Sequence, residues 1–266
     1  MQQIALTDGV QLPAFVSANL FAFALVLCRV GPFFLLAPVL SANLLPARAK
    51  FAAAAAISVA LAPIAAHAHA IPQQPIDLAL LFAQEIGVGL AIALALSVLA
   101  AAVAAGASLV DTLVGFSFGS LVDPITGVNA SVVGQVYTLF AMMILIVTGG
   151  LELMIMGLAR SYDMIPIGTF PAPSQLGRLA VSALTEIPLI GLELVGPVIL
   201  AVVVVDAAFG LVARAVPQMN VFVVGLPVKV IAAFVVIAAT LPFVGGHLEN
   251  DLQQAIQRTL SMLATG

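Results

Sequence analysis

The feature that most constrains this sequence is a set of long apolar segments with very few charged residues. Residues 78–110, for example, contain one charged side chain, that of Glu85. Apolar residues make up 63% of the chain and charged residues 8%, whereas a typical globular domain is about half apolar and about a quarter charged. Because so few charges cannot cover a soluble surface, we expect the chain to lie in a lipid bilayer or inside a membrane-associated assembly.

The apolar segments predict helices, although their lengths do not suit simple membrane spans. Six segments can be distinguished, at about residues 12–40, 50–66, 78–110, 131–158, 178–212 and 221–245. They are rich in Ala and Leu and show no period-two alternation, which favours helix over strand. A span requires about 20 apolar residues, so 50–66 is short, while a straight helix over 78–110 would be ~50 Å long. We therefore predict an all-α, membrane-associated bundle in which the third segment tilts, protrudes, bends or doubles back.

Prolines interrupt two of these segments. We expect a helix over about residues 12–30, a break at Gly31-Pro32, and a second short helix to about residue 40, because an interior proline removes a hydrogen bond and kinks a helix. Pro188 and Pro197 interrupt the segment 178–212 in the same way. The sequence thus predicts kinked helices.

Acidic residues lie within the apolar segments, where a charge costs about 3 kcal/mol or more at the centre of a bilayer. They are Glu85, Glu152, Glu186, Glu193 and Asp206, and we regard Arg29 as the one base that is comparably placed. One interpretation makes these acids a proton relay or an ion path. The other, which we favour, places them against water, a helix terminus or the polar groups of a neighbouring subunit.

The distribution of basic residues does not give a consistent membrane topology. Arg48 and Lys50 suggest that the loop at 41–49 is cytoplasmic, whereas Arg160 and Arg178 flank a loop that six alternating spans would place outside. Together with the segment lengths, this conflict favours a chain held by other subunits over a self-sufficient bundle.

Several kinds of function lack support in the sequence. With a net charge of -4 and no basic run, the chain shows no sign of nucleic-acid binding. Cys28 is the only cysteine, and we interpret it as a small core residue. The first eleven residues lack Lys and Arg, so no cleaved secretory signal is expected. His67 and His69 are too few ligands for a metal site, and no cofactor is expected.

The peptide GFSFG, residues 115–119, formally matches the G-x-S-x-G pattern of a nucleophile elbow. That pattern requires a strand–turn–helix context and a histidine base, and neither is expected near Ser117, so an enzyme is disfavoured. The segment continues to residue 129 as a Gly-containing apolar loop, which lipid alone would not tolerate. We interpret it as a plug or gate within a pore; a plain interhelical turn remains the alternative.

The segment RAVPQMNVFVVGLPVK, residues 214–229, separates the last two apolar segments. Pro217 can begin a turn or a helix, where its missing N–H costs nothing. Gln218 and Asn220 can satisfy freed backbone groups. We therefore predict a helix–turn–helix hairpin with a cation at each side of its base, Arg214 and Lys229, and with a bend early in the second helix.

Four segments, in order along the chain, carry motifs that resemble those of one known family. They are RVGPFFLLAPVLSANLLPARAK (29–50), GFSFGSLVDP (115–124), DMIPIG (163–168) and RAVPQMNVFVVGLPVK (214–229). The family is that of the flagellar and type III secretion export-gate proteins, called FliR in flagella and SctT in injectisomes. The similarity covers almost the whole chain, and its last block is the most specific.

The resemblance implies a single-copy subunit that assembles with FliP and FliQ homologues into a helical ring around a protein-conducting pore. It also implies a FlhB-like switch protein as a partner, unfolded secreted proteins as cargo, and a place in the bacterial inner membrane at the basal body. Residues 1–175 would correspond to a FliP-like part with a plug loop at 110–129, and residues 176–266 to a FliQ-like hairpin. Such a ring is lifted largely out of the bilayer plane, which would account for the unusual segment lengths and topology.

The resemblance also implies two sets of site residues. The plug or gate loop comprises Gly115, Phe116, Ser117, Phe118, Gly119, Leu121, Val122, Asp123 and Pro124. The hairpin or subunit-contact motif comprises Arg214, Pro217, Gln218, Asn220, Phe222, Gly225 and Pro227, and we expect its tip to face partner subunits. Flexible Met and Phe side chains of the lumen could seal around varied unfolded chains.

Two positions depart from the family pattern. Leu151 stands where a histidine is expected, so no role of that histidine carries over, and Asp111 ahead of the plug loop is unusual. A secondary transporter with broken helices and intramembrane acids is the alternative function, although the expected internal repeat is not evident. The sequence does not separate a flagellar from an injectisome system; we favour flagellar.

Overall fold

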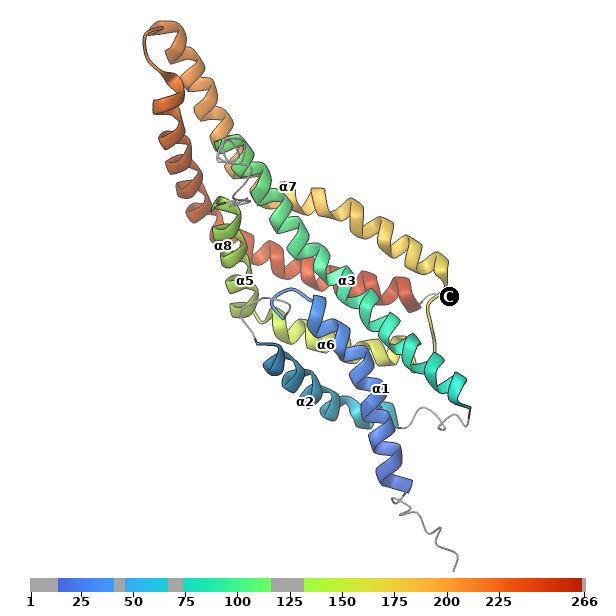
Figure 1. Cartoon of the computed structure of the whole chain (residues 1–266). Coiled ribbons are helices and arrows are strands. Elements are labelled where there is room, and N and C mark those ends of the chain that lie inside the picture. Colours follow the sequence, from blue (N-terminus) through green and yellow to red (C-terminus); the bar gives the residue numbers. More distant parts are fainter. Residues whose placement is uncertain (1–13, 41–45, 67–73, 116–131, 265–266) are drawn as a thin grey trace, which may run out of the picture. The chain divides into compact units, whose positions relative to one another are not determined.

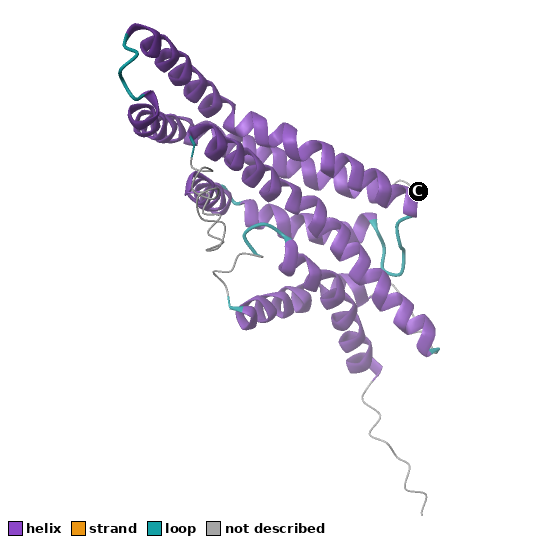
Figure 2. Ribbon diagram, turned by 45° about the horizontal axis from the view of Figure 1, so that its top comes forward, coloured by secondary structure: helices purple, strands orange, loops and turns teal. Residues whose placement is uncertain are grey.

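The computed structural model of the chain describes residues 14–40, 46–66, 74–115 and 132–264. In these ranges the chain forms helices and turns and no strand (Figure 2). The helices are α1 (Ala14–Leu36), α2 (Ala47–Ala66), α3 (Pro75–Val114), α5 (Val132–Val147), α6 (Gly150–Met164), α7 (Pro173–Ala215) and α8 (Val221–Ala264). The all-α prediction is confirmed.

Three helices are long and apolar enough to cross a membrane: α3, α7 and most of α8. Helix α3 has 40 residues, which at ~1.5 Å per residue gives ~60 Å, about twice the hydrocarbon thickness of a bilayer. Because α3 is one continuous helix, the segment 78–110 does not double back. A helix of this length tilts strongly in a bilayer or extends beyond it.

Helices continue through prolines at which we expected breaks. The break after residue 30 was wrong, because α1 passes through Gly31-Pro32 and ends at Leu36. Val30 and Phe33, on either side of the proline, are both fully buried. Since a proline removes one backbone hydrogen bond, this packing is sufficient to hold the helix together.

Helices α7 and α8 are likewise uninterrupted, through two prolines each. Glu186 and Glu193 therefore lie on the same uninterrupted helix, α7. Helix α8 also continues beyond the predicted end at residue 245, to Ala264. The last part of α8 is amphipathic, with Leu248 and Leu252 buried. Because its other face is polar, it does not form a continuous apolar segment, and the sequence therefore did not predict it.

The segment 131–158, which we expected to be one helix, is two. Helices α5 and α6 meet at Thr148-Gly149 and are bent by 67°. Gly149 has a φ of 81°, a left-handed conformation that glycine adopts without the steric cost of a Cβ. This bent pair is either a broken span or a re-entrant structure.

By packing, the chain divides into two compact units. Unit 1 comprises Met1–Leu94, Met156–Leu176 and Leu260–Gly266. Within it, α1 and α2 lie side by side (Figure 1). Helix α1 also approaches the first half of α3 so closely that a Cβ on Gly89 would meet the carbonyl oxygen of Arg29. The core includes Val26, Val30 and Val88, all fully buried.

Unit 2 comprises Ala95–Ile155 and Gly177–Thr259. Its longest feature is the hairpin of α7 and α8, which are joined by a short turn (Figure 1). The second half of α3 packs against α7 where Gly106 and Gly191 face each other; a Cβ built on Gly106 would lie 2.5 Å from the Gly191 carbonyl oxygen. Such small residues allow two helix backbones to approach closely.

Candidate functional site

Helix α1 places Arg29 in the core of unit 1, where the side chain is fully buried against Glu85 of α3. The guanidinium donates from Nε to Glu85 Oε2 at 2.7 Å and from Nη2 to Oε1 at 3.2 Å. Both side chains have 0% exposure. A two-point pair of this kind is charge-assisted and directional, so it fixes α1 against α3.

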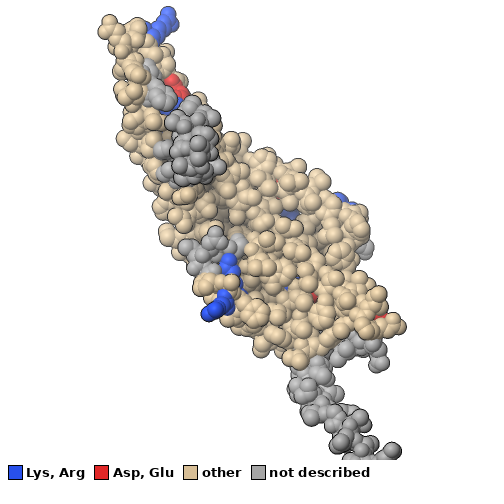
Figure 3. Space-filling view, viewed as in Figure 1, with Lys and Arg blue, Asp and Glu red and all other residues tan. Residues whose placement is uncertain are grey.

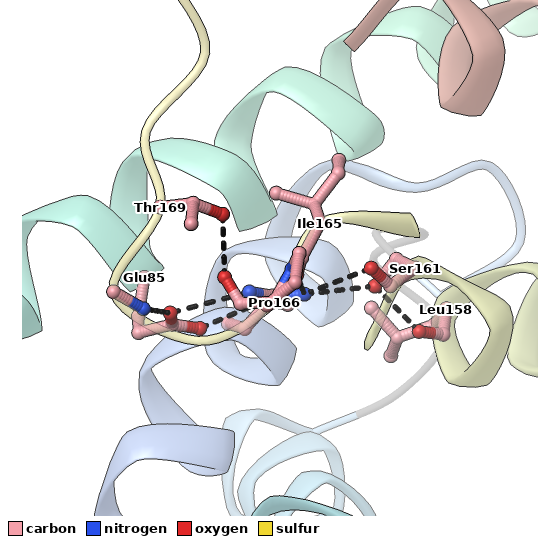
Figure 4. Close-up of polar contacts among 8 residues, drawn as sticks. Glu85, Leu158, Ser161, Ile165, Pro166 and Thr169 are labelled. Atoms are coloured by element: carbon pink, nitrogen blue, oxygen red, sulfur yellow. Dashed lines mark hydrogen bonds and ion pairs between the residues drawn. The ribbon is translucent and has the colours of Figure 1, made fainter. Parts of the chain in front are cut away.

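The same two side chains also hold the end of α6 and the connection that follows it (Figure 4). Arg29 Nη1 donates to the Ser161 hydroxyl at 3.2 Å and to the Ile165 carbonyl at 3.1 Å. Glu85 Oε1 accepts from the Gly168 N–H at 3.1 Å, and Gly168 has a left-handed φ of 79°. We call Arg29, Glu85, Ser161, Ile165 and Gly168 the buried polar cluster.

The contacts of the buried polar cluster favour structure over proton transfer. Arg29 also lies over the ring of Tyr162, with its Cζ 4.2 Å from the ring centroid. Glu85 thus has a fixed counter-charge and a backbone donor, which compensate its burial. Glu85 was expected to face water, a helix terminus or a neighbouring subunit, and this was wrong, because its partner Arg29 belongs to the same chain.

Two other acids have partners that we did not foresee. Asp206 of α7 pairs with Lys229 of α8, and Glu186 of α7 pairs with Arg258 of α8 at 2.9 Å. The expectation that only Arg29 was placed to pair with an acid was therefore wrong. The sequence separations are 23 and 72 residues, and only the return of α8 along α7 brings the partners together.

The last two predicted acids are exposed. Glu152 lies in the first turn of α6, where the helix dipole favours a negative charge. Glu193 faces outward from α7. Leu151, at the position expected to be histidine, is half-buried in the first turn of α6.

The hairpin motif forms the predicted helix–turn–helix. Helix α7 ends at Ala215, and α8 begins at Val221 after a turn that contains Pro217 and Gln218. Asn220 caps α8, because its Oδ1 accepts from the Val223 N–H at 3.3 Å. Arg214 lies in the last turn of α7, beside the turn itself, and not at the base of the hairpin.

The remaining members of the motif lie in the first turns of α8. Gly225 is buried against the ring of Phe209, and Pro227 is exposed within a continuous helix. Phe222 lies in the first turn of α8, and its side chain is outside the described part of the structure.

Large apolar side chains are exposed along both helices of the hairpin. They are Leu200, Val203, Val204, Leu211, Val212 and Val216 on the α7 side and Val223, Val224, Val228, Ile231 and Val235 on α8. Figure 3 shows few charged side chains among these elements. We call this set the hairpin apolar surface. It exceeds what a water-soluble monomer exposes, so lipid or protein covers it.

Of the plug loop predicted at 110–129, the structure describes residues 110–115. The start at residue 110 was wrong, because α3 continues to Val114. Gly115 follows α3 with a left-handed φ of 105°. Residues 116–131 lie outside the described ranges, and with them Phe116 to Pro124, including Ser117 of the disfavoured nucleophile pattern. His67 and His69 lie outside them as well. Among the residues that the structure does describe, no group of three or more His, Cys, Asp or Glu could hold a metal ion.

Asp111 links the end of α3 to the first turn of α5. Its Oδ2 accepts from the N–H of Gly134, the third residue of α5, at 3.1 Å, and the Asp111 side chain is buried. The backbone N–H of Gly115 in turn bonds to the Asp111 carbonyl at 3.0 Å. Sequence reasoning noted Asp111 only as unusual; an acid in the last turn of a helix, where the dipole disfavours it, was the available signal of a distant partner.

Comparison with known proteins agrees with these features. The family described as "Bacterial export proteins, family 1" matches residues 20–255. The "Flagellar biosynthetic protein FliR" of Bacillus subtilis (strain 168) is 27% identical over 91% of this chain and 95% of its own length. That of Escherichia coli (strain K12) is 28% identical over 87% of this chain and 88% of its own.

A relative with a different name is similar to the same extent. The "Surface presentation of antigens protein SpaR" of Salmonella typhimurium is 27% identical over 89% of this chain and 88% of its own length. The region matched by the family model, residues 20–255, contains the buried polar cluster, Asp111 and the whole hairpin turn. The chain belongs to family 1 of the bacterial export proteins, and is a membrane-associated component of a flagellar or type III export apparatus.

Proposed function

We propose that this chain is a structural and pore-forming subunit of the export gate. In this role it assembles with FliP-like and FliQ-like subunits and conducts unfolded proteins across the inner membrane. A FlhB-like switch protein is its further partner, and the chain itself carries out no catalysis. The observation that carries the proposal is the family match over residues 20–255, together with relatives named for flagellar biosynthesis.

The hairpin apolar surface supports assembly. Leu211, for example, is 72% exposed and Leu200 66%, although each is a residue that proteins normally bury. Neighbouring helices of the same kind would cover such a surface over its whole length. The intrachain partners of Glu85, Asp206 and Glu186 also fit this role, because these acids then require no cation from another subunit.

The described residues give little support to the alternative function, a secondary transporter. It predicts helices interrupted near unpaired acids, whereas α7 and α8 are continuous and three of the five acids are paired. The bent pair α5 and α6 is the one feature that it shares with such proteins.

We further propose that the chain consists of two parts with different roles in the gate. Residues 1–175 act as a FliP-like part, with a plug loop at 110–129 that lies across the closed pore, and residues 176–266 act as a FliQ-like hairpin whose tip faces partner subunits. The two compact units divide the chain by packing and not by likeness to other subunits, so they do not bear on this division.

Co-purification tests the proposal. The tagged chain is expressed with its FliP-like and FliQ-like partners, extracted in mild detergent and examined by native mass spectrometry, and we expect a single copy within a larger ring. Leu211→Glu should abolish ring formation while leaving the monomer folded, since Leu211 makes little contact within the chain. Gln74→Glu, an exposed polar position ahead of α3 and outside the hairpin, is the matched control. A chain that runs as a lone monomer or dimer beside its partners would refute the proposal.

The plug assignment has its own test. Deletion of residues 115–122 should raise the leak of ions or small molecules through assembled complexes in vesicles. An unchanged leak in complexes of normal composition would remove the plug assignment and leave the assembly proposal intact.

A further inference from the structure

Unit 1 contains few charged residues besides the ion pair of the buried polar cluster. Arg160 and Asp163 lie one turn apart on α6, where their charges offset each other. In the described ranges of unit 1, the remaining charged residues are Arg48, Lys50 and Asp77. The two bases lie at the start of α2, and the acid lies at the start of α3.

The packing of the helices separates the two bases from the acid. Helices α1 and α3 run in the same direction, because the Phe21 ring contacts the Phe82 ring, and Arg29, further along α1, pairs with Glu85, further along α3. The start of α3 therefore lies beside the start of α1. Helix α2 begins on the side of unit 1 at which α1 ends (Figure 1). The two bases thus lie at one end of unit 1, and the acid lies toward the other.

The outer face of α2 is apolar. Ala54, Ser58 and Leu61 are buried and share one face at helical spacing, whereas Phe51 is 65% exposed and Val59 62%. The hydroxyl of Ser58 donates to the Ala54 carbonyl at 2.7 Å, within the helix. A helix at the surface of a water-soluble protein normally carries polar residues on its outer face. The outer face of α2 suits an apolar surround, and only its first turn offers charge.

We propose that the start of α2 is a contact surface for the headgroups of anionic phospholipids. Arg48 and Lys50 bind the headgroups, and Phe51 and Val59 face the acyl chains. Figure 3 shows basic side chains together at the start of α2. Long basic side chains at the end of an apolar helix can extend to the headgroup level while their methylene groups stay in apolar surroundings.

The charges favour a lipid surface as the occupant. An acidic protein segment would complement the two bases, but it would not cover the apolar face that begins at Phe51, whereas an anionic bilayer complements both. The cytoplasmic leaflet has a negative surface potential. The contact therefore orients unit 1 with the start of α2 toward the cytoplasm and Asp77 away from it. The inference rests on the membrane association of the chain and not on the proposed function.

The test measures which lipid lies next to α2 in the full chain. With Cys28 replaced by Ala, a bimane fluorophore is attached either to Ala52→Cys, on α2, or to Ala79→Cys, near the start of α3; both positions are exposed. The chain is reconstituted in phosphatidylcholine vesicles that contain a minor fraction of brominated phosphatidylglycerol or, separately, of brominated phosphatidylcholine. Brominated phosphatidylglycerol should quench the label on α2 more strongly than brominated phosphatidylcholine does. The label on α3 should show no such preference.

Removal of the two bases should abolish the preference. Each base near an anionic surface favours the anionic lipid by about fivefold, so Arg48→Gln with Lys50→Gln should lower the relative association of phosphatidylglycerol by about 25-fold. High salt should weaken the preference of the unmodified chain, because it screens exposed charges. Arg178→Gln with Arg214→Gln is the matched control. It removes the same charge from two exposed positions of unit 2 and should leave the preference intact.

Three results would overturn the inference. The label on α2 could escape quenching by both lipids, which would show that protein or water covers this face. The preference for phosphatidylglycerol could be equal at the two labels, or it could survive the loss of Arg48 and Lys50. It could also fall as far in the control variant, in which case net charge and not α2 attracts the anionic lipid.

Discussion

Replacement of Arg29 by Met should destabilise the chain strongly, through Glu85. The substitution removes both hydrogen bonds to the Glu85 carboxylate and leaves that carboxylate fully buried without a cation. Breaking a buried ion pair by removing one partner costs about 3–5 kcal/mol. For a chain of this size, 1 kcal/mol corresponds to roughly 2–4 °C in Tm, so we expect a decrease of about 6–20 °C.

The chain provides its own reporter for this experiment. Cys28 is the only cysteine of the sequence, adjoins Arg29, and is half-buried. The rate at which a thiol-reactive dye labels Cys28 during a temperature ramp therefore follows opening of unit 1 at the buried polar cluster. In Arg29→Met, labelling should begin at a lower temperature.

Two further variants make the reasoning refutable. Arg258→Met removes a pair with Glu186 whose side chains are 54% and 25% exposed, and exposed pairs contribute about 0–1 kcal/mol. The double variant Arg29→Met, Glu85→Met should recover much of the lost stability, because no buried charge remains. A decrease in Arg29→Met no larger than in Arg258→Met, or a double variant less stable than the single one, would show that the pair does not act in this way.

Two local predictions follow from backbone geometry. Gly89→Ala should lower Tm by several degrees, because the added Cβ would meet the Arg29 carbonyl of α1. Gly177→Ala is the control and should be neutral or slightly stabilising, because no atom lies within 4 Å of its added Cβ. Equal changes in Tm for the two variants would contradict the close approach of α1 and α3. Asn220→Ala should cost about 0.5–1 kcal/mol through loss of the α8 cap, and Gln218→Ala close to nothing, as measured by thermal unfolding followed by the helical circular-dichroism signal. An Asn220→Ala variant as stable as Gln218→Ala would show that the cap is not formed.

The elements that could be predicted from the sequence are those whose signal is local. The turn at residues 214–229 carries its own proline and capping asparagine, so the helix–turn–helix was predictable. The bend at Gly149 was not, because a single glycine within an apolar segment does not reveal which φ it adopts. The break predicted at Pro32 was wrong because a local signal was present but not decisive. The preference of proline for a break is outweighed there by the burial of Val30 and Phe33.

The polar contacts depend on residues far apart in the sequence. Arg29 and Glu85 were both recognised as unusual, yet 56 residues separate them, and only the packing of α1 on α3 makes them partners. Asp111 was noted without a role for the same reason. The sequence thus indicated which charged residues required a partner or a polar environment, whereas only the fold shows which partner each of them has.

The prolines that α7 and α8 accommodate have a consequence for what surrounds the hairpin. Pro188, Pro197, Pro227 and Pro242 are all exposed, and each withholds the amide hydrogen that would normally bond to the carbonyl four residues earlier. Lipid chains have no donor to offer such an oxygen. At these four levels along the hairpin, a hydrocarbon surround leaves the freed carbonyl oxygen to side chains or to local adjustment of the helix itself, whereas water or the donor groups of another protein would satisfy it directly.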